Sequence, residues 1–191
     1  MAKNWKIRKD LSIEVCGHTL FRIECTQDFK EIKAGTMGGY VEKEENLDGY
    51  AWVSGDAWVS GDARVYGDAK VYGNAEVSGN AKVYGDALVS GDALVSGNAE
   101  VSDNAWVSGD KITNKDDICY ISNRYYNITI TPLHIKIGCQ YHAQEAWWNF
   151  TNEQIEKMDG ESALIFWKIW KEPLKQICAA MKKEKGEDNA E

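Results

Sequence analysis

Residues 51–110 read AWVSGD AWVSGD ARVYGD AKVYGN AEVSGN AKVYGD ALVSGD ALVSGN AEVSDN AWVSGD, which is ten consecutive copies of a six-residue unit. Only one glycine position departs from the pattern, at Asp103. Successive side chains of a strand point to opposite faces, so the valine of each unit points away from both of its neighbours. We therefore expect valine and alanine inside and the Gly-Asp or Gly-Asn pair at a turn. A strict period of six residues predicts a parallel β-helix.

Three units make one triangular coil, so residues 18 positions apart stack at the strand spacing of about 4.8 Å. The same register continues upstream of the ten units. It places Val41 and Leu47 in the valine position and Gly39 and Glu45 in the alanine position. We therefore predict an all-β solenoid of about four coils over residues 39–110.

The rest of the chain does not follow the period of six. Residues 1–38 hold two strand-like runs, 11–15 and 20–25, and are expected to form an N-terminal hairpin cap, because solenoids need protected ends. Residues 111–142 are predicted to hold short β-strands, at 118–121, 128–131 and 135–139. We expect a helical region over 143–185 and a flexible tail over 186–191.

The helical region has internal signals of its own. Thr151 and Gln154 fit a capping box, and Asp159 with Gly160 indicates the end of a short helix. Beyond them, apolar residues that include Trp167 and Trp170 are spaced three or four apart along one helix seam. Pro173 leaves open whether one helix or two carry this seam. The seam is expected either to cover the open end of the solenoid or to join subunits.

Composition limits the function. The net charge is −8, and the repeat holds three basic residues against nine acidic ones, which argues against direct nucleic-acid binding. The five cysteines include no C-x-x-C pair, which favours reduced thiols in a cytoplasm. No stretch approaches the roughly 20 apolar residues of a membrane span. We expect a cytoplasmic protein without a membrane partner, a metal or a cofactor.

The outward positions of the solenoid form three faces. Face one carries Trp52, Lys70, Leu88 and Trp106; face two carries Tyr40, Trp58, Glu76 and Leu94; face three carries Asn46, Arg64, Lys82 and Glu100, with Tyr66 and Tyr84 alongside. Soluble monomers avoid contiguous exposed apolar patches, so we expect an oligomer or partner interface among these residues: Trp52, Trp58, Leu88, Leu94, Trp106, Trp167 and Trp170. On face three, cations beside aromatic rings suit an anionic, planar, nucleotide-like ligand. The candidate ligand-binding residues are Arg64, Tyr66, Lys82 and Tyr84.

The unit resembles the hexapeptide repeat of left-handed β-helix proteins, in which an aliphatic residue is followed four positions later by a small one, as Val53 is followed by Ala57. This resemblance implies left-handed coiling and a homotrimer. A narrower resemblance covers the segment before the repeat, in particular residues 20–23, 28–29 and 33–42. That segment resembles the opening of phage and prophage proteins labelled polymer-forming cytoskeletal protein or putative transferase. It implies a phage accessory protein in the host cytoplasm, for example in counter-defence.

Three classes of function follow from these observations. The first is a non-enzymatic, oligomeric binding protein that sequesters an anionic ligand or blocks a host protein. The second is an acyltransferase, because many hexapeptide-repeat proteins transfer acyl groups with a histidine base; here His18, His134 and His142 all lie outside the ten units. The third is an acidic DNA mimic, although Trp and Leu interrupt its acids. We expect the first class, with no catalytic residue.

Overall fold

The computed structural model describes the backbone of residues 3–187 and the side chains of residues 3–182. The chain divides into two compact units, an N-terminal unit that ends at Ile118 and a C-terminal unit that begins at Cys119. Within the described residues, no helix combines the length and the apolar composition needed to cross a membrane.

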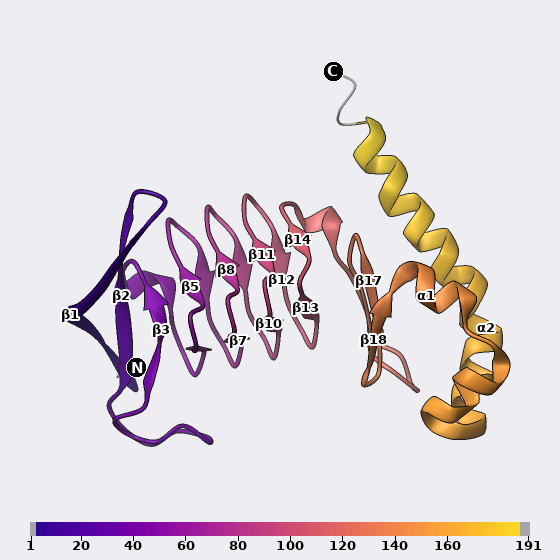
Figure 1. The fold of residues 1–191 in the computed structure, drawn as a ribbon, viewed down its shortest axis with the longest axis horizontal. Coiled ribbons are helices and arrows are strands. Elements are labelled where there is room, and N and C mark those ends of the chain that lie inside the picture. Colours follow the sequence, from indigo (N-terminus) through magenta and orange to yellow (C-terminus); the bar gives the residue numbers. More distant parts are fainter. Residues whose placement is uncertain (1–2, 188–191) are drawn as a thin grey trace. The chain divides into compact units, whose positions relative to one another are not determined.

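The N-terminal unit contains the parallel β-solenoid that the repeat predicts, with short strands stacked coil upon coil (Figure 1). Each coil adds one strand to each of three sheets. The sheet of face one holds β4 (Trp52–Val53), β7 (Lys70–Val71), β10 (Leu88–Ser90) and β13 (Trp106–Ser108). The sheet of face two includes β3 (Met37–Val41), β5 (Trp58–Val59), β8 (Glu76–Val77), β11 (Leu94–Val95) and β14 (Lys111–Ile112). The sheet of face three holds β6 (Arg64–Val65), β9 (Lys82–Val83) and β12 (Glu100–Val101).

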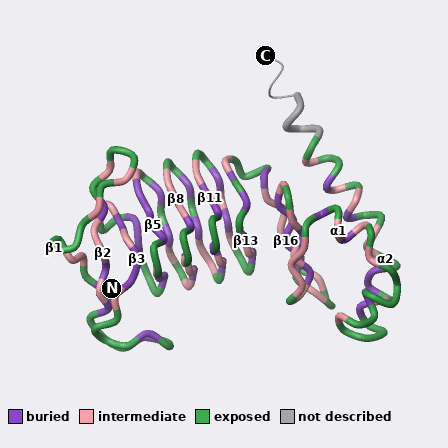
Figure 2. Tube along the Cα trace, in the orientation of Figure 1, coloured by how far each residue is buried: buried purple, intermediate pink, exposed green. Residues whose placement is uncertain are grey.

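The coils pair with the expected register of 18 residues, since Val71 has Val53 and Val89 as its Cα partners. Backbone groups join the coils, as in the hydrogen bond from the Ser60 N–H to the Val77 carbonyl oxygen at 3.0 Å. Every valine of the ten units is 0% exposed and every alanine at most 1% exposed. The interior therefore consists of valine and alanine ladders, with exposed residues at the corners (Figure 2).

Glycine is favoured at the turn of the units because the backbone there is left-handed. Gly73 has a φ of 77°, and a Cβ atom on it would lie 3.0 Å from the backbone nitrogen of Gly91 in the next coil. Asp103 occupies the same position with a φ of 57°. Aspartate tolerates this conformation better than most residues, so the one exception in the repeat keeps the turn.

The solenoid extends beyond the ten units with one residue fewer in its last turn. Lys111 pairs with Leu94, so the register there is 17 residues instead of 18. The Leu94 N–H donates to the Asp110 carbonyl oxygen at 2.9 Å, where earlier coils offer an alanine carbonyl. Ile112 is 0% exposed and continues the valine ladder of its sheet. A short 3-10 helix, η2 (Lys115–Asp117), follows.

The first coil departs from the predicted register near its second unit. Leu47 is 0% exposed and occupies the valine position, as expected. Glu45, which we expected in the alanine position, is exposed because the chain makes a 3-10 turn, η1 (Glu44–Asn46). Asn46, which we expected on face three, is buried, and its Nδ2 atom donates to the Ala63 carbonyl oxygen at 2.9 Å. A buried amide needs such partners, and this bond explains why the side chain turns inward.

A β-hairpin precedes the solenoid and joins one of its sheets. Its strands, β1 (Trp5–Val15) and β2 (His18–Cys25), are longer than the sequence indicated. The turn consists of Cys16 and Gly17, with φ values of 50° and 83°. Strand β2 pairs antiparallel with β3, so the hairpin extends the sheet of face two at its N-terminal edge. Ile23 is 0% exposed, which shows that the hairpin contributes to the core.

The C-terminal unit begins with a four-stranded antiparallel sheet in chain order, β15 (Cys119–Ile121), β16 (Ile128–Ile130), β17 (His134–Ile137) and β18 (Gln140–Ala143). Three strands were expected there. The fourth was missed because the predicted strand over 135–139 contains a turn, at which Gly138 has a φ of 58°.

Two helices follow the sheet, α1 (Gln144–Asn149) and α2 (Asn152–Glu187). The predicted capping box is confirmed, because the Gln154 N–H donates to Thr151 Oγ1 at 3.3 Å and the Thr151 N–H donates to Gln154 Oε1 at 2.9 Å. The last four residues of the predicted tail, 188–191, lie outside the described residues.

Helix α2 changes direction at the predicted place and not at its proline. Asp159 and Gly160 have non-helical backbone angles, and Gly160 has a φ of 65°. The helix continues through Pro173. Proline removes the hydrogen bond to the carbonyl group four residues earlier, which belongs to Ile169. Ile169 is 60% exposed, so this part of the helix lies at the surface of the unit.

The apolar seam of α2 is buried within the C-terminal unit itself. Trp167 is 3% exposed and Leu174 is 0% exposed, and both belong to one core cluster with Ile130, Ile135 and Trp147. We expected this seam to cover the solenoid or to join subunits. It packs against the sheet and helix of its own unit, because that sheet is itself apolar on one face.

Candidate binding faces of the solenoid

Face three presents a ladder of charges next to a ladder of rings. Arg64, Lys82 and Glu100 occupy equivalent positions on three successive coils. Two residues further along, the rings of Tyr66 and Tyr84 are stacked, with centroids 5.0 Å apart and planes 5° from parallel. The repeat enforces this stacking, because equivalent positions on neighbouring coils are one strand spacing apart. The four predicted ligand-binding residues therefore lie together on one face.

The two cations of this face differ in their partners. Lys82 Nζ lies 2.9 Å from Glu100 Oε1, and this hydrogen bond raises the pKa of Lys82. The guanidinium carbon of Arg64 lies 5.6 Å from the centroid of the Tyr66 ring. Among the described residues, no carboxylate forms an ion pair with Arg64. Arg64 therefore keeps its hydrogen-bond donors for solvent or a ligand.

Arg64 also lines a hollow of about 600 Å³ on the N-terminal unit. The other basic residues of the hollow already have acceptors. Lys43 Nζ lies 2.8 Å from Asp62 Oδ1, and Lys3 Nζ donates to the Glu44 carbonyl oxygen at 2.7 Å. The hollow carries four carboxylates, Glu44, Glu45, Asp48 and Asp62. An anionic group would thus meet repulsion in the hollow and attraction at Arg64.

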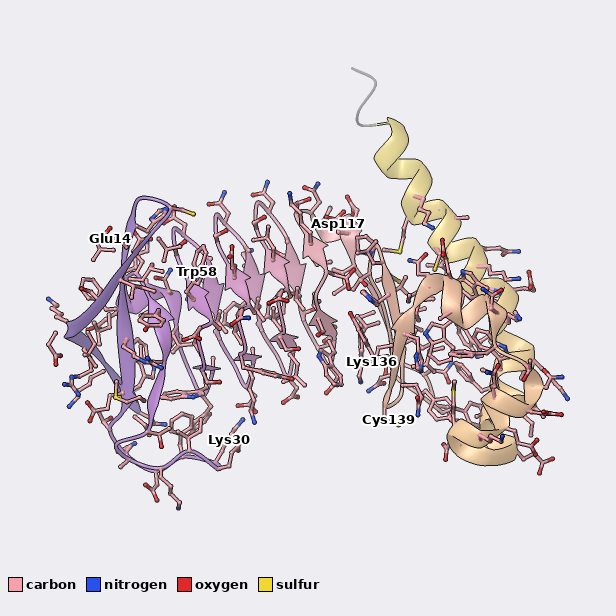
Figure 3. All side chains as sticks on the ribbon, viewed as in Figure 1. Glu14, Lys30, Trp58, Asp117, Lys136 and Cys139 are labelled. Carbon is pink, nitrogen blue, oxygen red and sulfur yellow. The ribbon has the colours of Figure 1, made fainter. Side chains whose placement is uncertain are left out.

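The tryptophans of the first coils are covered within the chain. Trp52 is 5% exposed and Trp58 is 9% exposed. The ring of Phe29 packs edge-on against Trp52, with centroids 5.7 Å apart and planes at 69°. Lys30 Nζ lies 2.7 Å from Asp68 Oδ1, and Glu31 forms an ion pair with Lys70 (Figure 3, Lys30 and Trp58 labelled). The segment before the repeat thus shields face one, which the period of six residues could not reveal.

The predicted interface residues of the later coils keep part of their surface. Leu88, Leu94 and Trp106 are half-buried. Leu88 and Trp106 are Cα partners on neighbouring coils of face one. The indole nitrogen of Trp106 donates to Ser90 Oγ at 3.0 Å, which fixes the ring across the strand pair. Leu88 and Trp106 thus form a small apolar patch on face one, whereas Leu94 lies on face two beside Lys111.

The other two predicted interface residues lie in the C-terminal unit. Trp167 is buried, with its ring centroid 5.4 Å from that of Trp147. Trp170 is half-buried and stacks on Phe166, with centroids 5.8 Å apart and planes 12° from parallel. Trp170 therefore offers some surface to a protein partner, whereas the 3% of Trp167 that is exposed is too little for such an interface.

His18 is held by a carboxylate of the first coil. Its Nδ1 atom lies 3.1 Å from Glu42 Oε1, and Glu42 Oε2 accepts the Gly61 N–H at 2.6 Å. Burial raises the pKa of Glu42, but the hydrogen bonds from Gly61 and His18 outweigh it, and the pKa lies below its ordinary value. No local sequence pattern predicts this pair, because its members lie 24 positions apart.

The other two histidines lie among aromatic rings in the C-terminal unit. His134 stacks on Tyr141, with centroids 4.7 Å apart. His142 packs edge-on against Trp147 at 5.2 Å and Phe150 at 5.0 Å, and burial lowers its pKa. These ring contacts are typical of histidines that pack within a structure.

The corner rows of the solenoid mix carboxylates with amides. Asn74 Nδ2 donates to Asp92 Oδ1 at 2.9 Å in the next coil, and Asn80 Nδ2 donates to Asn98 Oδ1 at 3.3 Å. The amides in these rows lower the density of negative charge along them. Nowhere in the described chain do three His, Cys, Asp or Glu side chains gather to hold a metal ion.

The match to a known protein family lies within the repeat. No curated protein matches the chain. Residues 81–97, close to one coil of the solenoid, match the family model described as the YdcK beta solenoid repeat. The match agrees with the β-solenoid architecture, and the chain is therefore similar, over this coil, to β-solenoid repeat proteins.

Proposed function

We propose that this chain is a non-enzymatic binding protein whose face three recognises an anionic group on a planar, nucleotide-like ligand. The observation that carries the proposal is Arg64. Its guanidinium lies beside the Tyr66 ring and, among the described residues, has no carboxylate partner. Basic residues around it are already paired.

The chemistry of Arg64 fits an anion with two oxygens. A guanidinium binds a carboxylate or phosphate through two parallel hydrogen bonds. The stacked rings of Tyr66 and Tyr84 give a rigid aromatic surface next to it. A planar group attached to the anion can pack on this surface, which accounts for the expected preference for a nucleotide-like molecule.

Lys82 supplies a second cation, and breaking its present ion pair costs little free energy. Its partner Glu100 is exposed, and an exposed ion pair contributes little to stability. Lys82 can therefore exchange Glu100 for a second anionic group of the ligand. This exchange favours a ligand with two or more negative charges over one with a single charge.

We further propose that the chain works as a homo-oligomer, with a trimer as the expected state. The half-buried patch of Leu88 and Trp106 on face one supports an interface on the later coils, and Leu94 adds a half-buried apolar side chain on face two. Trp52 and Trp58 are buried within the chain and cannot contribute much to it. A protein partner on the same patch is the alternative occupant.

Native mass spectrometry of the protein purified from expressing cells tests both proposals in one experiment. We expect a trimer that carries an additional mass of several hundred daltons, released intact on denaturation. The variant with Arg64→Gln and Lys82→Gln should form the same oligomer without the additional mass. If the double variant retains the ligand as well as the wild type does, face three is not the site.

An acyltransferase is the second candidate, favoured by the pair of His18 and Glu42. A carboxylate that accepts a hydrogen bond from one imidazole nitrogen orients the other to accept a proton, as a general base requires. The measurement is release of coenzyme A from acetyl-coenzyme A in the presence of amine or hydroxyl acceptors. We expect no turnover above background. Turnover that His18→Gln abolishes would replace the binding proposal with this one.

A further inference from the structure

The C-terminal unit contains an apolar pocket that is independent of face three. Its cavity volume is about 50 Å³, within about 390 Å³ of empty space that includes open solvent. Four aromatic side chains line it, those of Tyr126, Trp147, Phe166 and Trp167. Among the described residues that line the pocket, Asp159 is the only Asp, Glu, Lys, Arg or His. The pocket thus combines aromatic walls with a single negative charge.

Two glycine turns shape this pocket. The break of α2 at Gly160, with its φ of 65°, follows directly on Asp159, which lines the pocket. Gly138, with a φ of 58°, lies close to Tyr126, and a Cβ atom on it would be 3.0 Å from Tyr126 Cδ1. A side chain at Gly138 would therefore displace the Tyr126 ring. The absence of a side chain at Gly138 thus leaves room for the Tyr126 ring.

The hydrogen bond between these two side chains fixes the charge of the pocket. The Tyr126 hydroxyl donates to Asp159 Oδ2 at 2.8 Å. Burial, together with the bond to Asp159, raises the pKa of Tyr126 to about 12, so the phenol is neutral at pH 7. Asp159 Oδ1 remains as an acceptor.

The nearby cation, Lys136, is bound by a backbone carbonyl group. Lys136 Nζ donates to the Gly138 carbonyl oxygen at 2.6 Å, and Lys136 is not among the residues that line the pocket. Figure 3 labels Lys136 and the neighbouring Cys139. Among the residues that line the pocket, the charge therefore comes from Asp159.

We propose that this pocket binds a small alkylammonium ion, with its methylated head against the rings of Trp147, Phe166 and Trp167 and its charge close to Asp159. Aromatic rings attract cations, and quaternary ammonium groups are recognised in such surroundings. The apolar walls disfavour a primary ammonium group, which holds its water strongly. The alkylated ion loses less hydration on entry. This binding would be separate from any anion on face three.

Choline and its neutral isostere 3,3-dimethyl-1-butanol provide the test, because they share a shape and differ in charge. Each is titrated into the full-length wild-type protein, and binding is followed by ¹H–¹⁵N NMR at the indole N–H of Trp147. This group donates to the Ile135 carbonyl oxygen at 2.7 Å and so has a defined environment. We expect choline to bind at least about tenfold more tightly than the isostere. Equal affinities, or no saturable shift with choline, would overturn the proposal.

The matched variants are Asp159→Asn and Glu161→Gln. Asparagine keeps an oxygen that can accept the Tyr126 hydroxyl but removes the charge, so choline should bind about tenfold more weakly while the isostere is unaffected. Glu161 is an exposed residue of the same helix, outside the pocket, and its change should leave both affinities as in the wild type. An equal loss in both variants would mean that net charge alone attracts choline. The comparison of two ligands on the wild type stands even if Asp159→Asn does not fold.

Discussion

The solenoid and the C-terminal unit bury their apolar surface in different ways. The solenoid has a core of valine and alanine, repeated without interruption over ten units. The C-terminal unit has a core of large residues, among them Trp147, Phe166, Trp167 and Leu174, that come from a sheet and two helices. In the solenoid each side chain buries little apolar surface, so stability depends on keeping all the coils in register. In the C-terminal unit a few large side chains bury most of the apolar surface.

This difference decides where binding residues can lie. In the solenoid, the outward positions hold Trp, Arg, Lys, Glu or Leu without any change of the core. Arg64 and Lys82 can therefore be replaced at little cost in stability. In the C-terminal unit the rings that line the pocket are also core residues, such as Trp147 and Trp167. Changes there should affect binding and stability together.

The largest expected effect is in the C-terminal unit. Leu174 is 0% exposed, so Leu174→Ala removes buried carbons and leaves a cavity. We expect it to lower the free energy of unfolding by about 2–5 kcal/mol. Urea unfolding followed by circular dichroism at 222 nm measures this value. A loss below about 1 kcal/mol would show that the unit lacks a close-packed core.

A smaller effect is expected at the turns of the solenoid. Gly73→Ala places a Cβ atom in a left-handed turn and 3.0 Å from the next coil, so the free energy of unfolding should fall by about 1–2 kcal/mol. The matched change is Asp103→Gly, which relieves the same conformation at the one position without glycine. It should be neutral or slightly stabilising. If the two variants change the free energy of unfolding in urea by the same amount, the turns do not determine the register.

The pH dependence separates the two units further. The pKa of Tyr126 is raised from 10.0 to about 12, chiefly by burial and then by its bond to Asp159. A raised pKa contributes stability that is fully present below pH 10 and is lost as the pH rises through 12. The difference in unfolding free energy between wild type and Tyr126→Phe should therefore shrink between these pH values. Urea titrations at pH 8, 10 and 11 measure it, and a difference that stays constant would contradict the assignment.

The smallest expected effect on stability is on face three. Glu100→Gln breaks the exposed ion pair with Lys82, and the free energy of unfolding should scarcely change. The same variant releases Lys82, so the affinity for a multiply charged anion should rise. Isothermal titration with pyrophosphate compares the variant with the wild type. A lower affinity would show that Glu100 positions Lys82 and does not compete for it.

The solenoid could be predicted from the sequence because one local rule is repeated. Valine at a fixed position and glycine at the turn specify coil, register and core, and residues 18 apart met as expected. The rule fails at some positions where the sequence departs from the repeat. Asn46 turned inward to bond the Ala63 carbonyl group, and Phe29 came from outside the repeat to cover Trp52.

The sites were less predictable than the fold. Placing Arg64, Tyr66, Lys82 and Tyr84 together needed only the period, whereas the pairing of Lys82 with Glu100 depends on side-chain conformations that no period describes. The aromatic pocket was missed for another reason. Tyr126 and Asp159 lie 33 positions apart, and the turn at Gly138 that brings strand β18 back was hidden inside a predicted strand.

The most direct test of anion recognition on face three is the affinity for ATP, a planar base with several negative charges, measured by isothermal titration on matched variants. Arg64→Gln should weaken binding at least about tenfold, because charge-assisted hydrogen bonds are lost. Lys111→Gln removes one exposed charge from face two and should leave the affinity unchanged. Equal affinities in wild type, Arg64→Gln and Lys111→Gln would contradict the proposed role of face three.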